Sequence, residues 1–398
     1  MAWNHKTRVV AFAVALQAIA GVFTAPAAAD IVPVSVPTNS EDIVSTEDPT
    51  ATGSVWSAPR IYLGKTGSAG ATLPLRGPGG AAPFAANAWP AGRILQAAGF
   101  AEVRLATAIT GAVAGGTTTS LTMAAAASSI DDFYLGMPIQ HANIGVGAIK
   151  GTSLIQDYNG TSKVAALAET LGVAPASGTY TIPPNVTYQL STLTVSPPLL
   201  SISIWRDKKR YDYRDVRIES LTLDLPVANE QNQSFPSIEF SMKGLPAGTA
   251  DEAAPPLTSA QLTSIAPFRN GKFTLDRVAL GHQSTRFAIQ SEVAGASNAA
   301  AEQGQDGYEI MSGTRTFDID LNQMAKTDFD LDTRVDNQTS VSSMSLWGMG
   351  PGNRWGFLVP EIVLDPMNNP GDRNGFVNLT GNAAFVGVDK SATLTLFW

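Results

Sequence analysis

The chain of 398 residues has no cysteine and only three histidines, His5, His141 and His282, which lie far apart. Without thiols it has no disulfide bond, no thiolate zinc site and no cysteine nucleophile. Charged residues make up 15% of the chain, and 34 acidic against 26 basic residues leave a net charge of -8. Such a chain has no overall attraction for phosphate, so its composition argues against nucleic-acid binding by counterion release.

The usual signatures of catalysis and cofactor binding are also missing. Residues 77–82 are rich in glycine, but Pro78 interrupts the turn and no acidic residue follows at the distance that a dinucleotide site needs. Residues 328–332 begin like a calcium loop, yet Thr333 stands where that loop needs glycine, so we interpret them as a strand with solvated carboxylates. No histidine lies in a hydrolase or metalloprotease motif. We therefore predict a protein that is not an enzyme, with no catalytic, cofactor-binding or metal-ligating residues.

The apolar run of residues 9–23 has two interpretations. With Lys6 and Arg8 before it and small residues at 25–30 after it, the run has the layout of a secretory signal. Within it, however, residues 10–16 alternate large side chains with alanine, which is the period of a β-strand. The run is too short to cross a bilayer comfortably, so we expect no membrane span.

Short strands with alternating polarity dominate the rest of the chain. Leucines alternate with polar residues over 219–225, and Asp318 and Asp320 lie on the wet face of a strand at 317–322. Only residues 90–98 and 258–265 favour short helices. We predict a mainly β protein, whose other strands lie at 200–205, 273–278, 286–290 and 392–398, with the basic run 208–214 as a charged hairpin turn.

Composition divides the chain into parts. Over residues 106–190 it shifts to alanine, glycine, threonine and serine, and Asn159 with Gly160 is a strong hairpin signal. We predict a small β-module inserted there. It interrupts a first β-domain, formed by residues 1–105 and 191–235, and a second β-domain follows at 236–398. Each predicted helix follows a basic residue with glycine and precedes a phenylalanine, a pattern that leaves open whether one β-domain duplicates the other.

These features together resemble the major tail tube proteins of long-tailed bacteriophages of the siphophage type. Residues 6–10 and 21–34 are similar to the opening strand, the glycine turn and the next strand of that family. Arg76 and Gly77, followed by Trp89 and Pro90, lead into residues 95–100, which resemble its short helix and closing glycine–phenylalanine step. Here Gln, Ala and Ala at 96–98 stand where Arg-Ala-Cys or similar is commoner in the family.

The resemblance extends over most of the chain through spaced patterns. Residues 132–139, 155–160 and 180–183 resemble a β-insertion that recurs in phage virion proteins. The strands at 201–205 and 218–223, with a third at 236–240 and then Gly244, follow the family's order.

In that family, β-sandwich subunits form rings that stack into a hollow tube with a continuous inner barrel. The resemblance implies a structural virion protein of tail-tube β-sandwich or barrel fold. It would assemble in the host cytoplasm and keep its N-terminal run as a strand. Genomic DNA would pass through the lumen without specific binding. Rings of three chains are implied if the domain is duplicated, and of six chains otherwise. The expected partners are the tape measure, tail terminator and distal tail or baseplate proteins, with no cofactor and no membrane.

A lumen through which DNA slides repels phosphate, so Asp224, Asp318 and Asp320 are the expected lumen-facing acidic residues. The polar stretches 37–42 and 294–298 are interpreted either as flexible arms between rings or as plain surface loops. The inserted module is expected to face outward, because inside the lumen it would block DNA. The alternative function is that of an exported β-sandwich binding or adhesin-type protein, which rests on the signal-like N-terminus and the Thr/Ser/Gly-rich middle.

Overall fold

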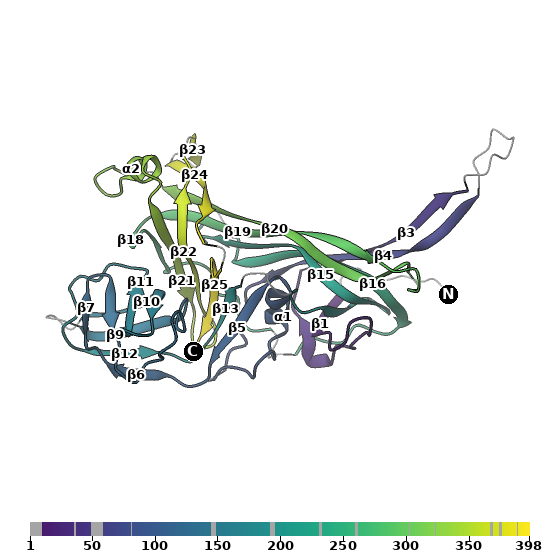
Figure 1. Cartoon of the computed structure of the whole chain (residues 1–398), viewed down its shortest axis with the longest axis horizontal. Coiled ribbons are helices and arrows are strands. Elements are labelled where there is room, and N and C mark those ends of the chain that lie inside the picture. The colour runs from purple at the N-terminus through teal and green to yellow at the C-terminus, as the bar shows by residue number, and fades with distance from the viewer. Residues whose placement is uncertain are drawn as a thin grey trace.

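The longest segments of alternating polarity form four long antiparallel strands that run side by side through the centre of the molecule (Figure 1). They are β15 (Lys209–Pro226), β16 (Ser237–Asp251), β19 (His282–Ser297) and β20 (Gln305–Asn322). The computed structural model describes residues 10–35, 37–48, 59–80, 82–144, 149–191, 196–230, 233–258, 262–301, 303–322, 324–366, 369–373, 376–387 and 389–398. The chain is mainly β, as predicted, and its described part contains two antiparallel sheets and two α-helices.

The larger sheet branches at β15. The first half of this strand pairs with β14 (Leu200–Arg206), and its second half pairs along the same edge with β19. Strand β14 pairs with β1 (Val10–Leu16), and β1 pairs with β2 (Ile31–Val32). A short 3-10 turn, Ala28–Asp30, comes directly before β2 in the chain. On the other edge of β15, β16 pairs with β4 (Arg60–Pro74), and β4 pairs with β3 (Thr38–Glu47).

A second branch lies at β22 (Arg354–Leu364). Its end pairs with β24 (Phe376–Phe385), which joins it to β20, and its start pairs with β25 (Thr393–Phe397). Beyond β25 the sheet continues to β13 (Asn185–Leu190) and then β5 (Phe100–Leu105). Beyond β22 it continues to β21 (Ser340–Gly348), β17 (Lys272–Leu275) and β18 (Val278–Ala279). Strand β23 (Asn369–Arg373) pairs with β24. The strand predicted at 273–278 is therefore a tight hairpin, β17–β18.

The main hydrophobic core is formed by side chains of the larger sheet and of helix α1 (Pro90–Ala97). Phe12, Phe240, Phe317 and Trp355 all belong to this core and are almost fully buried. The core combines side chains from residues 1–105, 185–235 and 236–398, so both predicted tube domains contribute to it. Their division at residue 235 stays a prediction.

The N-terminal apolar run forms strand β1, as its alternation predicted. Its large side chains Phe12 and Val14 enter the main core, while Ala11 and Ala13 face Trp205 in a small cluster on the other side. All seven residues of β1 pair with β14. The alanine face of β1 must be small because side chains pack against both faces of this strand.

One of the two predicted helices is confirmed and the other is wrong. Helix α1 (Pro90–Ala97) begins with proline in its first turn and ends before Gly99, whose φ of 102° suits glycine. Residues 258 and 262–265 of the predicted helix are not helical, and residues 259–261 lie outside the described residues. There the carbonyl of Thr263 accepts a hydrogen bond from Arg76 and that of Ser264 accepts one from Asn353, both at 2.8 Å. These carbonyls are thus bound by side chains from distant loops.

The segment 328–332 is also not the strand that the sequence suggested. Asp330 is the N-cap of helix α2 (Leu331–Asp336), and its carboxylate accepts the backbone N–H of Thr333 at 3.1 Å. The aspartate therefore stabilises a helix terminus rather than the wet face of a sheet.

A second, seven-stranded sheet lies at one end of the molecule, beside β21 and β22 (Figure 1). It has its own core of Tyr134, Tyr158, Tyr180 and smaller residues. The predicted hairpin at Asn159 and Gly160 is confirmed, because β10 pairs with β11 there. Its strands are β6 (Ile109–Ala112), β7 (Gly115–Thr117), β8 (Ser120–Thr122), β9 (Pro138–Ile144), β10 (Ile149–Asn159), β11 (Val164–Leu167) and β12 (Thr179–Ile182). Strand β13, within the predicted module limits of 106–190, belongs instead to the larger sheet.

Candidate functional site: an acidic sheet face and a projecting arm

Strand register brings the three aspartates of the sequence analysis onto one face of the larger sheet. Asp224 of β15 lies opposite Arg286 of β19, and Arg286 lies opposite Asp318 of β20. Asp320 is two residues beyond Asp318, so it points to the same side. These positions form the centre of what we call the acidic face.

Burial of the alternate residues determines which way this face points. Leu223 and Leu225 flank Asp224, Phe317 and Ile319 flank Asp318, and all four apolar side chains are at most 3% exposed. Because side chains alternate along a strand, the carboxylates point away from the core. The sequence pattern had indicated this orientation for each strand separately. It did not indicate that β15 and β20 lie on either side of the same strand.

The acidic face is slightly hollowed, with a concavity of about 420 Å³. Its described lining includes Asp224, Asp318, Asp320 and a fourth carboxylate, Glu239 of β16. Arg286 is the one basic residue among these lining residues. Sequence reasoning missed Glu239, which lies between buried Ile238 and Phe240, and Arg286, which lies between buried Thr285 and Phe287. The local charge is thus strongly negative.

Burial and mutual repulsion perturb these carboxyl groups. Burial raises the pKa of Asp224, and the negative charge of Glu239 raises it further, while Arg286 acts against both. Burial also raises the pKa of Asp318, again opposed by Arg286. One guanidinium therefore does not offset the loss of hydration at either aspartate.

Neither described histidine is among the residues that line this face. His282 is half-buried and stacked on Phe273 at 4.1 Å between ring centroids, and desolvation lowers its pKa to about 4. His141 lies at the junction with the smaller sheet, 3.7 Å from Glu169. In the described segments, no cluster of three or more His, Asp or Glu side chains is arranged to hold a metal ion. His5 lies outside the described residues.

A two-stranded arm is the second notable feature. Strand β16 pairs with β4 only from Gly67 onward, so residues 60–66 of β4 have β3 as their paired neighbour (Figure 1). We call residues 41–48 and 59–66 the arm. Large apolar side chains are exposed on it, among them Ile43 at 64% and Tyr62 at 54%. The stretch 37–42 and the stretch 294–298, considered as flexible segments, lie largely in strands β3 and β19.

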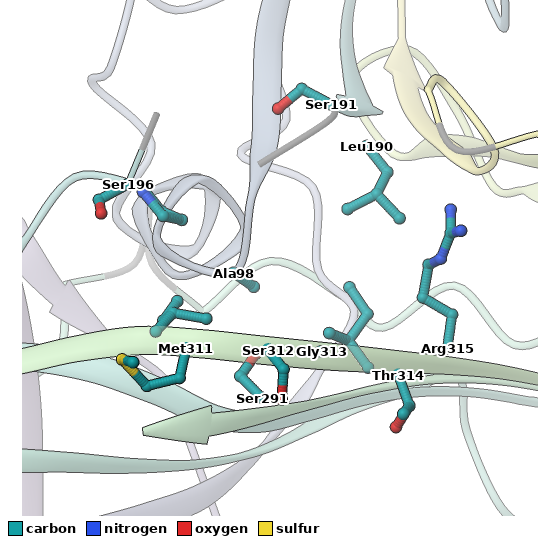
Figure 2. A pocket seen from close by; sticks show the side chains of 13 residues that line it. Ala98, Leu190, Ser191, Ser196, Ser291, Met311, Ser312, Gly313, Thr314 and Arg315 are labelled. Carbon is teal, nitrogen blue, oxygen red and sulfur yellow. The ribbon is translucent and has the colours of Figure 1, made fainter. Parts of the chain in front are cut away.

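A separate hollow of about 300 Å³ lies between the end of α1 and strand β20. Figure 2 shows Ala98 at the helix end facing Met311, Ser312 and Gly313, with Leu190 and Arg315 towards one side. Its lining is made of small hydroxyl groups, apolar groups and one charged side chain, Arg315. It contains no pair of titratable groups suited to acid–base chemistry among its described residues.

No helix in the parts of the chain that the structure describes is both long and apolar enough to cross a membrane. A scan against models of known protein families finds no match, and no curated protein shows significant sequence similarity to this chain.

Proposed function

We propose that this chain is the tail tube subunit of a long-tailed bacteriophage, a structural protein that assembles into stacked rings around a DNA-conducting lumen. The observation that carries the proposal is the register of β15, β19 and β20, which gathers Asp224, Asp318 and Asp320 on one polar face. In the proposed assembly this face lines the lumen.

The electrostatics of the face suit such a channel. DNA carries a phosphate charge about every 1.7 Å of its axis, so attractive side chains would hold it in place. Carboxylates repel phosphate and let the duplex slide. Arg286 lies between Asp224 and Asp318 in the register, and this leaves no cluster of basic side chains at the centre of the face.

The arm supports self-assembly. An isolated two-stranded ribbon is marginal in water, and exposed apolar side chains such as Ile43, Ile61 and Leu63 gain by burial against another surface. In the proposed tube this surface belongs to a neighbouring copy of the chain. Tape measure, tail terminator and baseplate proteins would bind the ends of the tube.

The position of β1 supports the proposal that the mature protein keeps its N-terminal apolar run. Removal of residues up to Ala27 would take away β1, whose Phe12 and Val14 belong to the main core. It would also remove the carbonyl of Val14, which accepts a hydrogen bond from Arg93 at 2.7 Å. An exported protein cleaved at this point would lose a fully paired strand.

Negative-stain electron microscopy of the purified full-length protein tests the proposal, together with N-terminal mass analysis of the same sample. Stacked rings with a hollow centre and an uncleaved N-terminus are the expected result, and ring symmetry distinguishes three chains from six. Dispersed monomers processed after Ala27 or Ala29 would contradict it and favour an exported binding protein.

A further inference from the structure

The arm is braced from the side by the tip of the β19–β20 hairpin. The Gln303 side-chain oxygen accepts the backbone N–H of Lys65 at 2.7 Å, and the Tyr62 hydroxyl lies 3.4 Å from the same atom. The backbone is close as well, since a Cβ added at Gly64 would lie 2.7 Å from the carbonyl oxygen of Gln303. These contacts fall on the part of β4 that β16 does not pair.

Hydrogen bonds close the described part of the hairpin tip, residues 298–301 and 303–306. Asn298 donates to both carboxylate oxygens of Asp306 at 2.7 Å and accepts the N–H of Ala300 at 2.9 Å. The backbone N–H of Asn298 is bonded to the carbonyl of Gly304, and Gly304 has a φ of 72° that suits glycine. Gln303 is therefore presented from a closed turn rather than from a loose loop.

The root of the arm is held at a second point. Asn39 donates to the Tyr213 hydroxyl at 3.1 Å, and the ring of Tyr213 lies where a Cβ at Gly67 would stand. A ribbon held only at its root is free to swing about that point. The Gln303 contacts at Gly64 and Lys65, two to three residues further out than Gly67, fix its direction.

We propose that Gln303 is a positioning residue that sets the direction in which the arm leaves the body. The use of a fixed arm direction rests on the proposed function, because an arm that binds a neighbouring subunit must point towards it before contact. Preorganisation of this kind reduces the entropy lost on assembly. The bracing itself is a property of the single chain.

The absence of cysteine allows a direct test in the monomer. Cysteines introduced as Thr46→Cys on the arm and Thr249→Cys on β16, both at exposed positions, carry spin labels for a distance measurement. Gln303→Ala should broaden the distance distribution roughly twofold, because the arm then swings about its root. Gln303→Glu keeps an acceptor oxygen and should restore a narrow distribution. Gln283→Ala, at the other end of the same hairpin, should leave it unchanged.

An unchanged distribution in Gln303→Ala would overturn the inference. So would equal broadening in Gln283→Ala, because that would show a general loss of hairpin order. Tube assembly is scored separately by electron microscopy, and Gln303→Ala should reduce it while Gln303→Glu should not. If the parent chain forms no tubes while Gln303→Ala still broadens the distribution, the bracing stands and the proposed function fails.

Discussion

Acid should weaken the fold through His282, a partly buried histidine whose Nε2 atom is shielded from solvent. Its ring stacks on Phe273 and lies 4.9 Å from the ring of Phe268, and burial lowers its pKa from 6.5 to about 4. The Nε2 atom is buried without a hydrogen-bond partner among the described residues. The unfolded chain therefore binds a proton at this position more readily than the folded chain does. The stability that neutral His282 provides is complete above pH 6.5 and is lost as the pH falls towards 4.

The size of the effect follows from the pKa shift. Between about pH 7 and about pH 4.5, the difference in proton binding lowers the free energy of unfolding by about 2 kcal/mol. His282→Phe keeps an aromatic ring in the stack but does not titrate. Urea unfolding of both proteins, followed by tryptophan fluorescence at the two pH values, isolates this residue because the carboxylates are common to both. The reasoning is refuted if the parent protein loses no more stability than His282→Phe over this range.

Three further substitutions test separate parts of the structure. Asp215→Ala removes a buried carboxylate that accepts hydrogen bonds from Gln17 and Gly21, both at 2.7 Å. It should cost about 2 to 3 kcal/mol in urea unfolding, and an unchanged midpoint would count against this network. Asp330→Ala removes the cap of α2 and should cost about 1 kcal/mol in the same assay, so no loss would contradict the capping role. Asp318→Lys should make assembled tubes retain DNA at low salt and release it at higher salt, whereas Asp328→Lys, outside the acidic face, should not; equal retention by both would refute the assignment.

Local periodicity was sufficient to predict much of the fold. The alternation in β1 predicted both its extended state and its small alanine face, and the Asn159–Gly160 signal predicted the β10–β11 hairpin. These features depend on neighbouring residues along the chain. The helix predicted at 258–265 failed because Arg76 and Asn353, distant in sequence, bind the carbonyls of residues 263 and 264. Such contacts leave no periodic signal.

The candidate site was predictable only in part. Alternation around Asp224, Asp318 and Asp320 indicated outward-facing carboxylates, but only the pairing of β15 with β19 and of β19 with β20 brings them together around Arg286. The arm had no distinct signal either. Isoleucines such as Ile43 and Ile61 are common in ordinary buried strands, so the sequence does not mark them as exposed. They are exposed because β16 pairs with β4 only from Gly67 onward.

The location of the acidic face within an assembly tests the central proposal most directly. Ser284 lies in the hollow of that face, and Ser284→Cys provides the only thiol in the chain for a small gold cluster. Three-dimensional reconstruction of labelled tubes should place the gold density around the central axis, inside the wall. Gold on the outer surface would contradict the proposal that this face lines a DNA-conducting lumen. The proposal would also be contradicted if neither the labelled protein nor the unlabelled parent formed tubes.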